Sequence, residues 1–363
     1  MFLGWRDLRR GARRFVLLGV VIALVALLAT VLSGLATGLV TDGISGLRAL
    51  PASRFAFEPG AQATFSRSTL RDDALAPFNA ADGVEASPLG VSFANAASIT
   101  GGPSLDLALF GVPADSFLVE RDDARQALAG TAGLVLSSEL EREGVQVGDT
   151  YTLGGSNVEL PVLGFTFAGT YGHAPIAYVS LATWQSINYG DAADGRFSAI
   201  ALSGPDSTDW DALATAANVD VLTKEAAYAG SPGFSAETAT MDLIRGFLLV
   251  ISALVIGAFF TVLTVQRTHQ IGLLKATGAS NWYVVRDGIG QMAVLVATAV
   301  LAGVAVGTAV VAVVARGDAP VELDPGDIAT SAVTLAVAGI AGSLVALRRI
   351  TGIEPAIALG TGS

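Results

Sequence analysis

The chain of 363 residues has no cysteine and only two histidines, His173 and His269. Without cysteine it cannot form disulfides, a thiolate nucleophile, a zinc finger or a cysteine-bound iron–sulfur cluster. Charge is also scarce: Asp, Glu, Lys and Arg make up 15% of the residues, against roughly 25% in a soluble domain. With 52% apolar residues the chain is neither disordered nor expected to be wholly soluble. Its net charge of −11 argues against nucleic acid as a partner.

Motifs for enzymatic chemistry are missing as well. The chain has no G-x-x-x-x-G-K-[ST] phosphate loop, no H-E-x-x-H zinc motif and no G-x-S-x-G nucleophile elbow. The topology predicted below puts the two histidines on opposite sides of a membrane, where they cannot share a metal ion. We therefore expect no enzyme activity in this chain, no metal site and no intrinsic cofactor.

In place of charge, the chain has four long apolar stretches without a charged residue: Phe15–Thr41, Gly246–Gln266, Gly288–Ala315 and Ile328–Leu347. A helix of about 20 apolar residues spans the hydrocarbon core of a bilayer, and it satisfies its own backbone hydrogen bonds there. We predict transmembrane helices at 15–41, 243–266, 288–315 and 328–347. Helices buried in a soluble core are the alternative. A cleaved signal peptide is a second alternative for the first stretch.

Basic residues mark three segments as cytoplasmic, because short loops rich in Lys and Arg stay inside. Five arginines precede the first stretch, and more basic residues lie between the second and third stretches and after the fourth. We predict cytoplasmic segments at 1–14, 267–287 and 348–363 and a short outer loop at 316–327. The protein is then expected in the plasma membrane, as a multi-pass chain with both termini cytoplasmic.

The long segment 42–242 is expected outside the membrane as a folded domain. Residues 42–241 carry 24 acidic and nine basic side chains, a balance that keeps such a domain away from an anionic lipid surface. Apolar runs between turn residues predict strands at Leu105–Phe110, Leu134–Leu136, Thr150–Leu153, Val158–Thr170 and Ala177–Val179. The predicted fold class is a membrane protein with four transmembrane α-helices and a large extracytoplasmic α+β domain between helices one and two.

Two short helices and one loop complete the expected outer domain. The helices are predicted at Ser137–Glu143 and Leu181–Ile187, with Ser137 and Ser180 as their N-caps. The polar stretch Asp191–Trp210 is predicted to be a surface loop.

Two pairs of glycines lie in the predicted membrane helices: Gly34 and Gly38 in the first, and Gly303 and Gly307 in the third. Small residues four positions apart let membrane helices approach closely. The partner helix belongs either to the same chain or to a second copy. Four helices enclose little space by themselves, so we expect a homodimer.

The predicted cytoplasmic loop contains an amphipathic segment, Thr268–Thr277. Ile271 and Leu274 lie on one side of it, and Gly278 is placed to end a short helix. Such a helix can bind in a groove of a soluble partner. From the residues alone, a tight loop that merely joins helices two and three is an equal alternative.

Gln266–Ser280, which reads QRTHQIGLLKATGAS, resembles the cytoplasmic signature of the FtsX-like, MacB-type ABC transporter permeases. The C-terminal segment Arg349–Leu359 is similar to the closing motif of that family. The outer domain follows the family's order at Gly111–Pro113, Leu134–Ser138 and Val147–Thr150. Resemblance to the haem-exporting, DevC-like subgroup rests on Gly34–Leu39, Ala52–Phe57, Phe65–Leu70 and Gly290–Gln291.

The resemblance implies a permease that works with a separate ATPase chain, in a complex of two permease and two ATPase copies. ATP and Mg²⁺ then bind to the partner ATPase, and its closure moves the outer domain through long helices. The ATPase contact is implied at His269, Gln270, Ile271, Gly272, Leu273, Leu274, Lys275, Ala276, Gly278 and Ala279. Gln270 stands where the family usually has a glutamate, which weakens the case for a charge-dependent contact there.

The same resemblance makes haem the expected substrate, exported from the membrane. The candidate residues are Phe57 and Glu58 after helix one, and Tyr228 and Met241 before helix two. Glu58 and Met241 offer iron a carboxylate and a thioether, a weak ligand pair that suits release, and the two rings can cover the porphyrin. The alternative is a strand core for Phe57, a solvated turn for Glu58 and packing for Met241.

Two other functions are compatible with the same topology. One is export of a lipid, lipoprotein or peptide by a permease of the same family. The other is a non-transporting, FtsX-like regulator of a cell-wall hydrolase, although the outer segment is larger than such a regulator usually has.

The coupling assignment predicts that Leu274→Asp separates the permease from its ATPase. The change puts a charge on the apolar side of the short helix, in an interface that would have to bury it. The variant should insert into the membrane but no longer co-purify with the ATPase. Undiminished co-purification would contradict the assignment.

Overall fold

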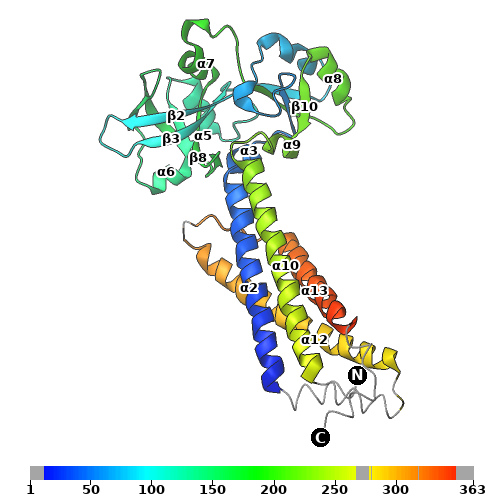
Figure 1. Ribbon diagram of the computed structural model, residues 1–363. Coiled ribbons are helices and arrows are strands. Elements are labelled where there is room, and N and C mark those ends of the chain that lie inside the picture. Colours follow the sequence, from blue (N-terminus) through cyan, green and yellow to red (C-terminus); the bar gives the residue numbers. More distant parts are fainter. Residues whose placement is uncertain (1–11, 267–277, 279, 318, 349–363) are drawn as a thin grey trace. The chain divides into compact units, whose positions relative to one another are not determined.

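The computed structural model describes residues 12–266, 278, 280–317 and 319–348. They form two compact units (Figure 1). The sheet domain is Val40–Glu237, and the helical unit consists of the described residues before and after it. The sheet domain is therefore an insertion between the first two long helices of the helical unit.

In the described residues, the helical unit contains α2 (Ala12–Asp42), α10 (Phe234–Gln266), α12 (Asn281–Val314) and α13 (Pro325–Arg348). Three segments are long and apolar enough to cross a membrane, namely Val16–Asp42, Phe234–Phe259 and Gly290–Val314, and α13 has a shorter apolar segment, Pro325–Ala341. Large apolar side chains remain exposed along these helices, such as Leu254 and Leu301 at 67% each. Exposed apolar rows of this kind suit contact with lipid, so the unit is built for a membrane.

α10 and α13, like α12, begin before the charge-free stretches that predict them. α10 starts at Phe234, and its first turns are polar. At α13, Asp324 is the N-cap, because its Oδ1 accepts a hydrogen bond from the Asp327 N–H at 2.8 Å. Pro325 follows in the first helical position, where no N–H is needed. Capping and polar turns therefore set these helix starts, and hydropathy does not.

Glycines let α2 and α12 pack backbone to backbone. A methyl group on Gly303 would overlap the carbonyl oxygen of Ala23, and one on Gly307 would lie 2.8 Å from Cβ of Thr30. Gly34 lies against the side chain of Val311, and Gly38 lies against the backbone of Pro320. All four glycines therefore contact segments of the same chain. The core beside them includes Leu18, Ile22, Ala26, Ile256, Val296, Ala299 and Leu335.

The sheet domain is a mixed sheet of ten strands in the order β10-β1-β9-β2-β3-β8-β4-β6-β5, with β7 paired to β8. Its strands are β1 (Arg54–Phe57), β2 (Glu85–Ser98), β3 (Leu105–Val112), β4 (Leu134–Ser137), β5 (Thr150–Leu153), β6 (Val158–Thr166), β7 (Thr170–Tyr171), β8 (Ala174–Ser180), β9 (Ala199–Ser203) and β10 (Asp220–Thr223). β3–β8 and β4–β6 are parallel pairs.

The long strand β2 organises this sheet, since three different strands pair with successive parts of it. Its first residues pair with β9, its middle with β3, and Ala96–Ser98 with β5. The contact with β5 closes β2-β3-β8-β4-β6-β5 into a ring, while β9, β1 and β10 extend from the other end of β2. Gly90 and Gly111, opposite each other on β2 and β3, leave a flat surface for the buried indole of Trp184.

The helices around the sheet are short: α3 (Ser45–Ala49), α4 (Ala76–Asn79), α5 (Asp122–Ala129), α6 (Ser138–Arg142), α7 (Leu181–Tyr189), α8 (Trp210–Ala217) and α9 (Lys224–Tyr228), with 3₁₀ turns at Phe65–Arg67, Asp72–Leu75 and Gly190–Ala192. The predicted N-cap at Ser180 is confirmed, because its hydroxyl accepts from the Thr183 N–H. Ser137 is at the N-cap position of α6 as predicted, but its side chain makes no capping hydrogen bond. The Ser137 hydroxyl accepts instead from the Gly169 N–H at 3.1 Å, so a distant partner replaces the local one.

The surface loop predicted at Asp191–Trp210 is wrong. This stretch contains β9, which lies between β1 and β2 and buries four of its five residues. The apolar run is only Ala199–Leu202, and the polar residues on both sides of it hide a short central strand from a reading based on composition.

The helix packing predicts that Gly303→Ala destabilises the membrane unit. The added methyl group would collide with the Ala23 carbonyl, and overpacking of this kind costs about 1–3 kcal/mol. Gly246→Ala is the matched control, because a methyl group there meets nothing within 4 Å. Thermal unfolding in detergent, followed by tryptophan fluorescence, should give a lower midpoint for Gly303→Ala alone. Equal midpoints would contradict the close α2–α12 contact.

Candidate functional site

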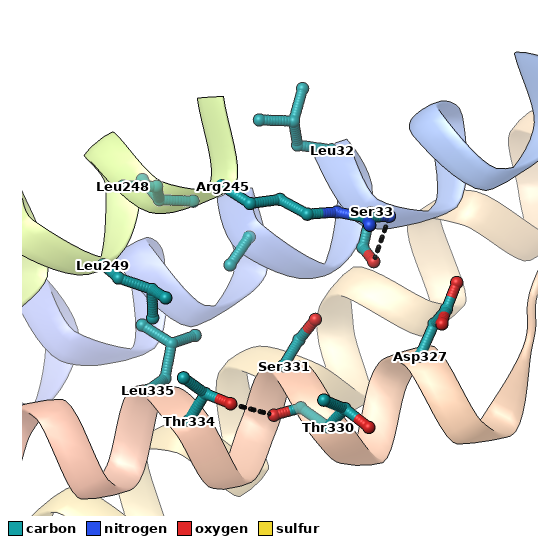
Figure 2. Close-up of a pocket in the computed structure, with 11 residues that line it drawn as sticks. Leu32, Ser33, Arg245, Leu248, Leu249, Asp327, Thr330, Ser331, Thr334 and Leu335 are labelled. Carbon is teal, nitrogen blue, oxygen red and sulfur yellow. Dashed lines mark hydrogen bonds between the residues drawn. The ribbon is translucent and has the colours of Figure 1, made fainter. Parts of the chain in front are cut away.

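Polar side chains meet among the apolar helices of the helical unit. Figure 2 shows Arg245 reaching from α10 to α2, where its Nη2 donates to Ser33 Oγ at 3.3 Å. The same nitrogen lies 3.4 Å from Thr37 Oγ1. The Thr37 hydroxyl donates to the carboxylate of Asp327 on α13, with 2.6 Å between Oγ1 and Oδ2. We call these four residues the Arg245 cluster.

Three residues of the Arg245 cluster, Ser33, Arg245 and Asp327, line a cavity of about 190 Å³. One wall is a face of α13, with polar side chains at the three- and four-residue spacing that lines up one side of a helix. These side chains are Asp327, Thr330, Ser331 and Thr334. Leu248 and Leu249 of α10 and Leu32 of α2 form the apolar wall (Figure 2). The cavity is therefore amphipathic.

The described residues offer the positive charge and the N–H donors of Arg245 only weak partners. The carboxylate of Asp242 lies 3.6 Å from its Nη1, but that side chain is 66% exposed, and exposed pairs contribute little. The Nε of Arg245 is buried without a hydrogen-bond partner among the described residues. Both hydroxyl contacts of Nη2 exceed the usual N–H···O range of about 2.7–3.2 Å. A charge placed this way in a membrane helix is expensive and favours a functional role.

The cluster lies at one end of the apolar runs. Arg245 directly precedes the charge-free stretch of α10, and Asp327 directly precedes that of α13. Ser33 and Thr37 lie in the last turns of α2. The three helices thus bring their polar residues together where the charge-free stretches of α10 and α13 begin. Sequence reasoning missed the cluster because Ser33 and Thr37 lie inside one apolar stretch, while Arg245 and Asp327 only mark where two others begin.

Two of the predicted haem residues lie at the end of β1. Phe57 is fully buried, and its ring centroid lies 5.0 Å from that of Phe65. Its ring is therefore covered by the domain core. Glu58 is exposed, and its Oε2 accepts from the Thr69 N–H at 3.0 Å.

The other two predicted haem residues belong to different units. Tyr228, on α9 of the sheet domain, is half-buried with its ring 6.2 Å from that of Phe234. Met241 belongs to the helical unit and lies on α10 one turn before Arg245. The assignment of Phe57, Glu58, Tyr228 and Met241 to haem stays a prediction.

The predicted ATPase-coupling residues fall mostly outside the described part of the chain. This holds for His269, Gln270, Ile271, Gly272, Leu273, Leu274, Lys275, Ala276 and Ala279. Gly278 is described, and its φ of +97° is in the region that favours glycine. The coupling helix therefore stays a prediction too.

His173 joins the two ends of the sheet domain. It lies with Gly172 in the two-residue turn between β7 and β8, and both have positive φ, as a type I′ hairpin turn requires. Its Nδ1 lies 2.9 Å from Asp42 Oδ2 at the end of α2, and its Nε2 lies 3.0 Å from Glu237 Oε1 at the start of α10. The hydrogen bond to Asp42, and then that to Glu237, raises the pKa of His173 above its ordinary value, although partial burial opposes this.

Comparison with known proteins finds one matching family and several distant relatives. Residues 243–355, which include α10, α12 and α13, match the family model described as FtsX-like permease C-terminal. A protein of Staphylococcus haemolyticus, named as a candidate hemin transport system permease protein HrtB, is 21% identical over 360 residues, covering 99% of each chain. Its namesake in Staphylococcus epidermidis strain ATCC 12228 is 22% identical over 370 residues, covering 100% of each.

Among solved structures, the extracellular domain of the noncanonic ABC-type transporter YknZ from Gram-positive bacteria is similar to part of the chain. The identity is 13% and the TM-score 0.31, over 45% of this chain and 88% of that one.

The protein is a multi-pass membrane protein with an extracellular domain, of the class that forms the membrane subunit of ABC transporters. Its C-terminal part, residues 243–355, matches the FtsX-like permease family. Proteins of this family are transmembrane subunits and not catalysts, so transport requires a partner ATPase. The relatives named HrtB extend the relationship over both units of the chain.

The His173 bridge predicts that protonation stabilises the sheet domain. Because the folded pKa is raised, the stabilisation is complete below the unfolded pKa of about 6.5 and is lost as the pH rises through the folded pKa. Thermal unfolding of the full chain between about pH 5 and pH 9 should therefore show a margin of wild type over His173→Gln that shrinks with rising pH.

The carboxyl group of Glu139 also makes the stability of the sheet domain depend on pH in that experiment. Burial raises the pKa of Glu139, which also interacts with Asp42, so its protonation favours the folded state at low pH as well. This contribution is present in both proteins and cancels in the comparison. A margin that does not change with pH would contradict the charged bridge.

Proposed function

We propose that the chain is the permease subunit of an efflux pump that exports haem from the membrane, driven by a separate ATPase. The full-length relationship carries this proposal, because the relatives named for hemin transport align with 99% and 100% of the chain. Both units are therefore related to theirs. At 21% and 22% identity, the relatives support a substrate class and not individual residues.

The proposed complex contains two permease and two ATPase chains, with ATP and Mg²⁺ on the ATPases. Both termini and residues 267–287 are cytoplasmic, and the ATPase binds at 267–287. The continuity of α10 supports mechanical coupling, since one helix of 33 residues runs from Phe234, within the sheet domain, to Gln266, directly before that segment. Movement at the cytoplasmic end is then transmitted to the sheet domain without an intervening loop.

Glu58 and Met241 are proposed as ligands of the haem iron, and Phe57 and Tyr228 as aromatic contacts of the porphyrin. Glu58 has one oxygen, Oε1, not used by the bond to Thr69. Met241 is partly exposed on α10. A carboxylate and a thioether hold iron weakly, which suits a site that must release its cargo.

Absorption spectra test the substrate. The purified full chain should develop a shifted Soret band when haem is added, and Glu58→Ala and Met241→Ala should each alter that band and lower the haem tolerance of cells. Glu85→Ala, an exposed glutamate on β2, is the matched control and should resemble the wild type.

The possible outcomes separate substrate from site. Wild-type spectra and wild-type tolerance in both variants would reject Glu58 and Met241 as ligands. A wild-type chain that never binds haem would reject haem and favour a lipid or peptide substrate for the same permease.

A further inference from the structure

We propose that the cavity beside Arg245 binds the anionic group of a membrane amphiphile, a carboxylate or a phosphodiester, with the guanidinium as its charged anchor. A haem propionate is one source of such a group, and in that respect the inference rests on the proposed function. The phosphate of a phospholipid is the other source. Both groups present two oxygens to which a guanidinium donates parallel hydrogen bonds.

Arg245 has donors available for this ligand. Its side chain is 35% exposed and lines the cavity, and its Nε has no hydrogen-bond partner among the described residues. The contacts of Nη2 to Ser33 and Thr37 are long, at 3.3 and 3.4 Å, and both partners are neutral hydroxyls. An anion can replace them with shorter, charge-assisted bonds.

Asp327 limits the charge of the ligand. Its carboxylate is held by Thr37 at 2.6 Å, and the same hydroxyl lies 3.4 Å from Arg245. A group with two negative charges would be repelled by this carboxylate. A group with one negative charge can pair with Arg245, while Asp327 meets a hydroxyl or an amine of the ligand. A carboxylate and a phosphodiester both carry a single charge.

The size and lining of the cavity favour a head group over a whole molecule. Its volume of about 190 Å³ is below the roughly 300–1,000 Å³ of sites that enclose drug-sized ligands. Leu248 and Leu249 continue the lining as an apolar surface beside Arg245 (Figure 2). The apolar body of an amphiphile would then remain in the lipid while its charged end enters the cavity.

Two measurements on the purified full chain test the site. The first is the affinity for haem and for haem dimethyl ester, whose propionates carry no charge, from Soret titrations in detergent. The second is the phospholipid phosphate that co-purifies per chain. Arg245→Gln removes the charge, and Arg316→Gln, an exposed arginine just beyond α12, is the matched control.

If the group comes from haem, the wild type and Arg316→Gln should bind haem about tenfold more tightly than the ester, and Arg245→Gln should lose this preference. If it comes from lipid, the bound phosphate should fall in Arg245→Gln alone. An Arg245→Gln chain that matches the wild type in both measurements overturns the site.

Two further results keep the test decisive. Should Arg245→Gln not fold, Arg245→Lys replaces it. A lysine keeps the charge but lacks the two-pronged geometry, so the preference for haem or the bound phosphate should fall without vanishing. A wild-type chain that binds no haem rejects the proposed function, and the phosphate measurement then tests the cavity on its own.

Discussion

The rest of the structure depends on one constraint: the hydrocarbon core of a bilayer offers no hydrogen-bond partner to a polar group. The backbone is therefore helical throughout α2, α10, α12 and the apolar part of α13. The hydrophobic effect does not drive helices together within lipid, so their association depends on close van der Waals packing. The approach of α2 and α12 at Gly303 and Gly307 supplies that contact. Polar side chains are consequently expensive in the helical unit, and their positions carry information.

The sequence predicts the parts of this fold that follow from hydropathy and local chemistry. Charge-free stretches locate the long helices, and Ser180 caps α7 as its spacing predicts. The predictions fail where distant contacts decide. β9 is a short run whose strand character comes from pairing with β1 and β2. The Ser137 hydroxyl does not cap α6, because it accepts from the N–H of Gly169, 32 positions away.

The candidate site was harder to predict because it is assembled from three helices. Ser33 lies inside an apolar stretch, and Arg245 and Asp327 each directly precede one. Only the packing of α2, α10 and α13 brings the three residues to one cavity. A sequence signal was present in α13, where four polar residues share one helical face. The family signature at 266–280 was more informative for function, since it depends on a contiguous motif that needs no knowledge of the fold.

The bridge from Asp42 through His173 to Glu237 has a consequence for how this protein can change over time. The two points at which the chain enters and leaves the sheet domain are held on either side of one imidazole ring. A domain whose ends are neighbours can be lengthened, shortened or exchanged without altering the spacing of the helices that carry it. The sheet domain is thus a module in the evolutionary sense. The membrane helices can keep their packing while the domain between them diverges.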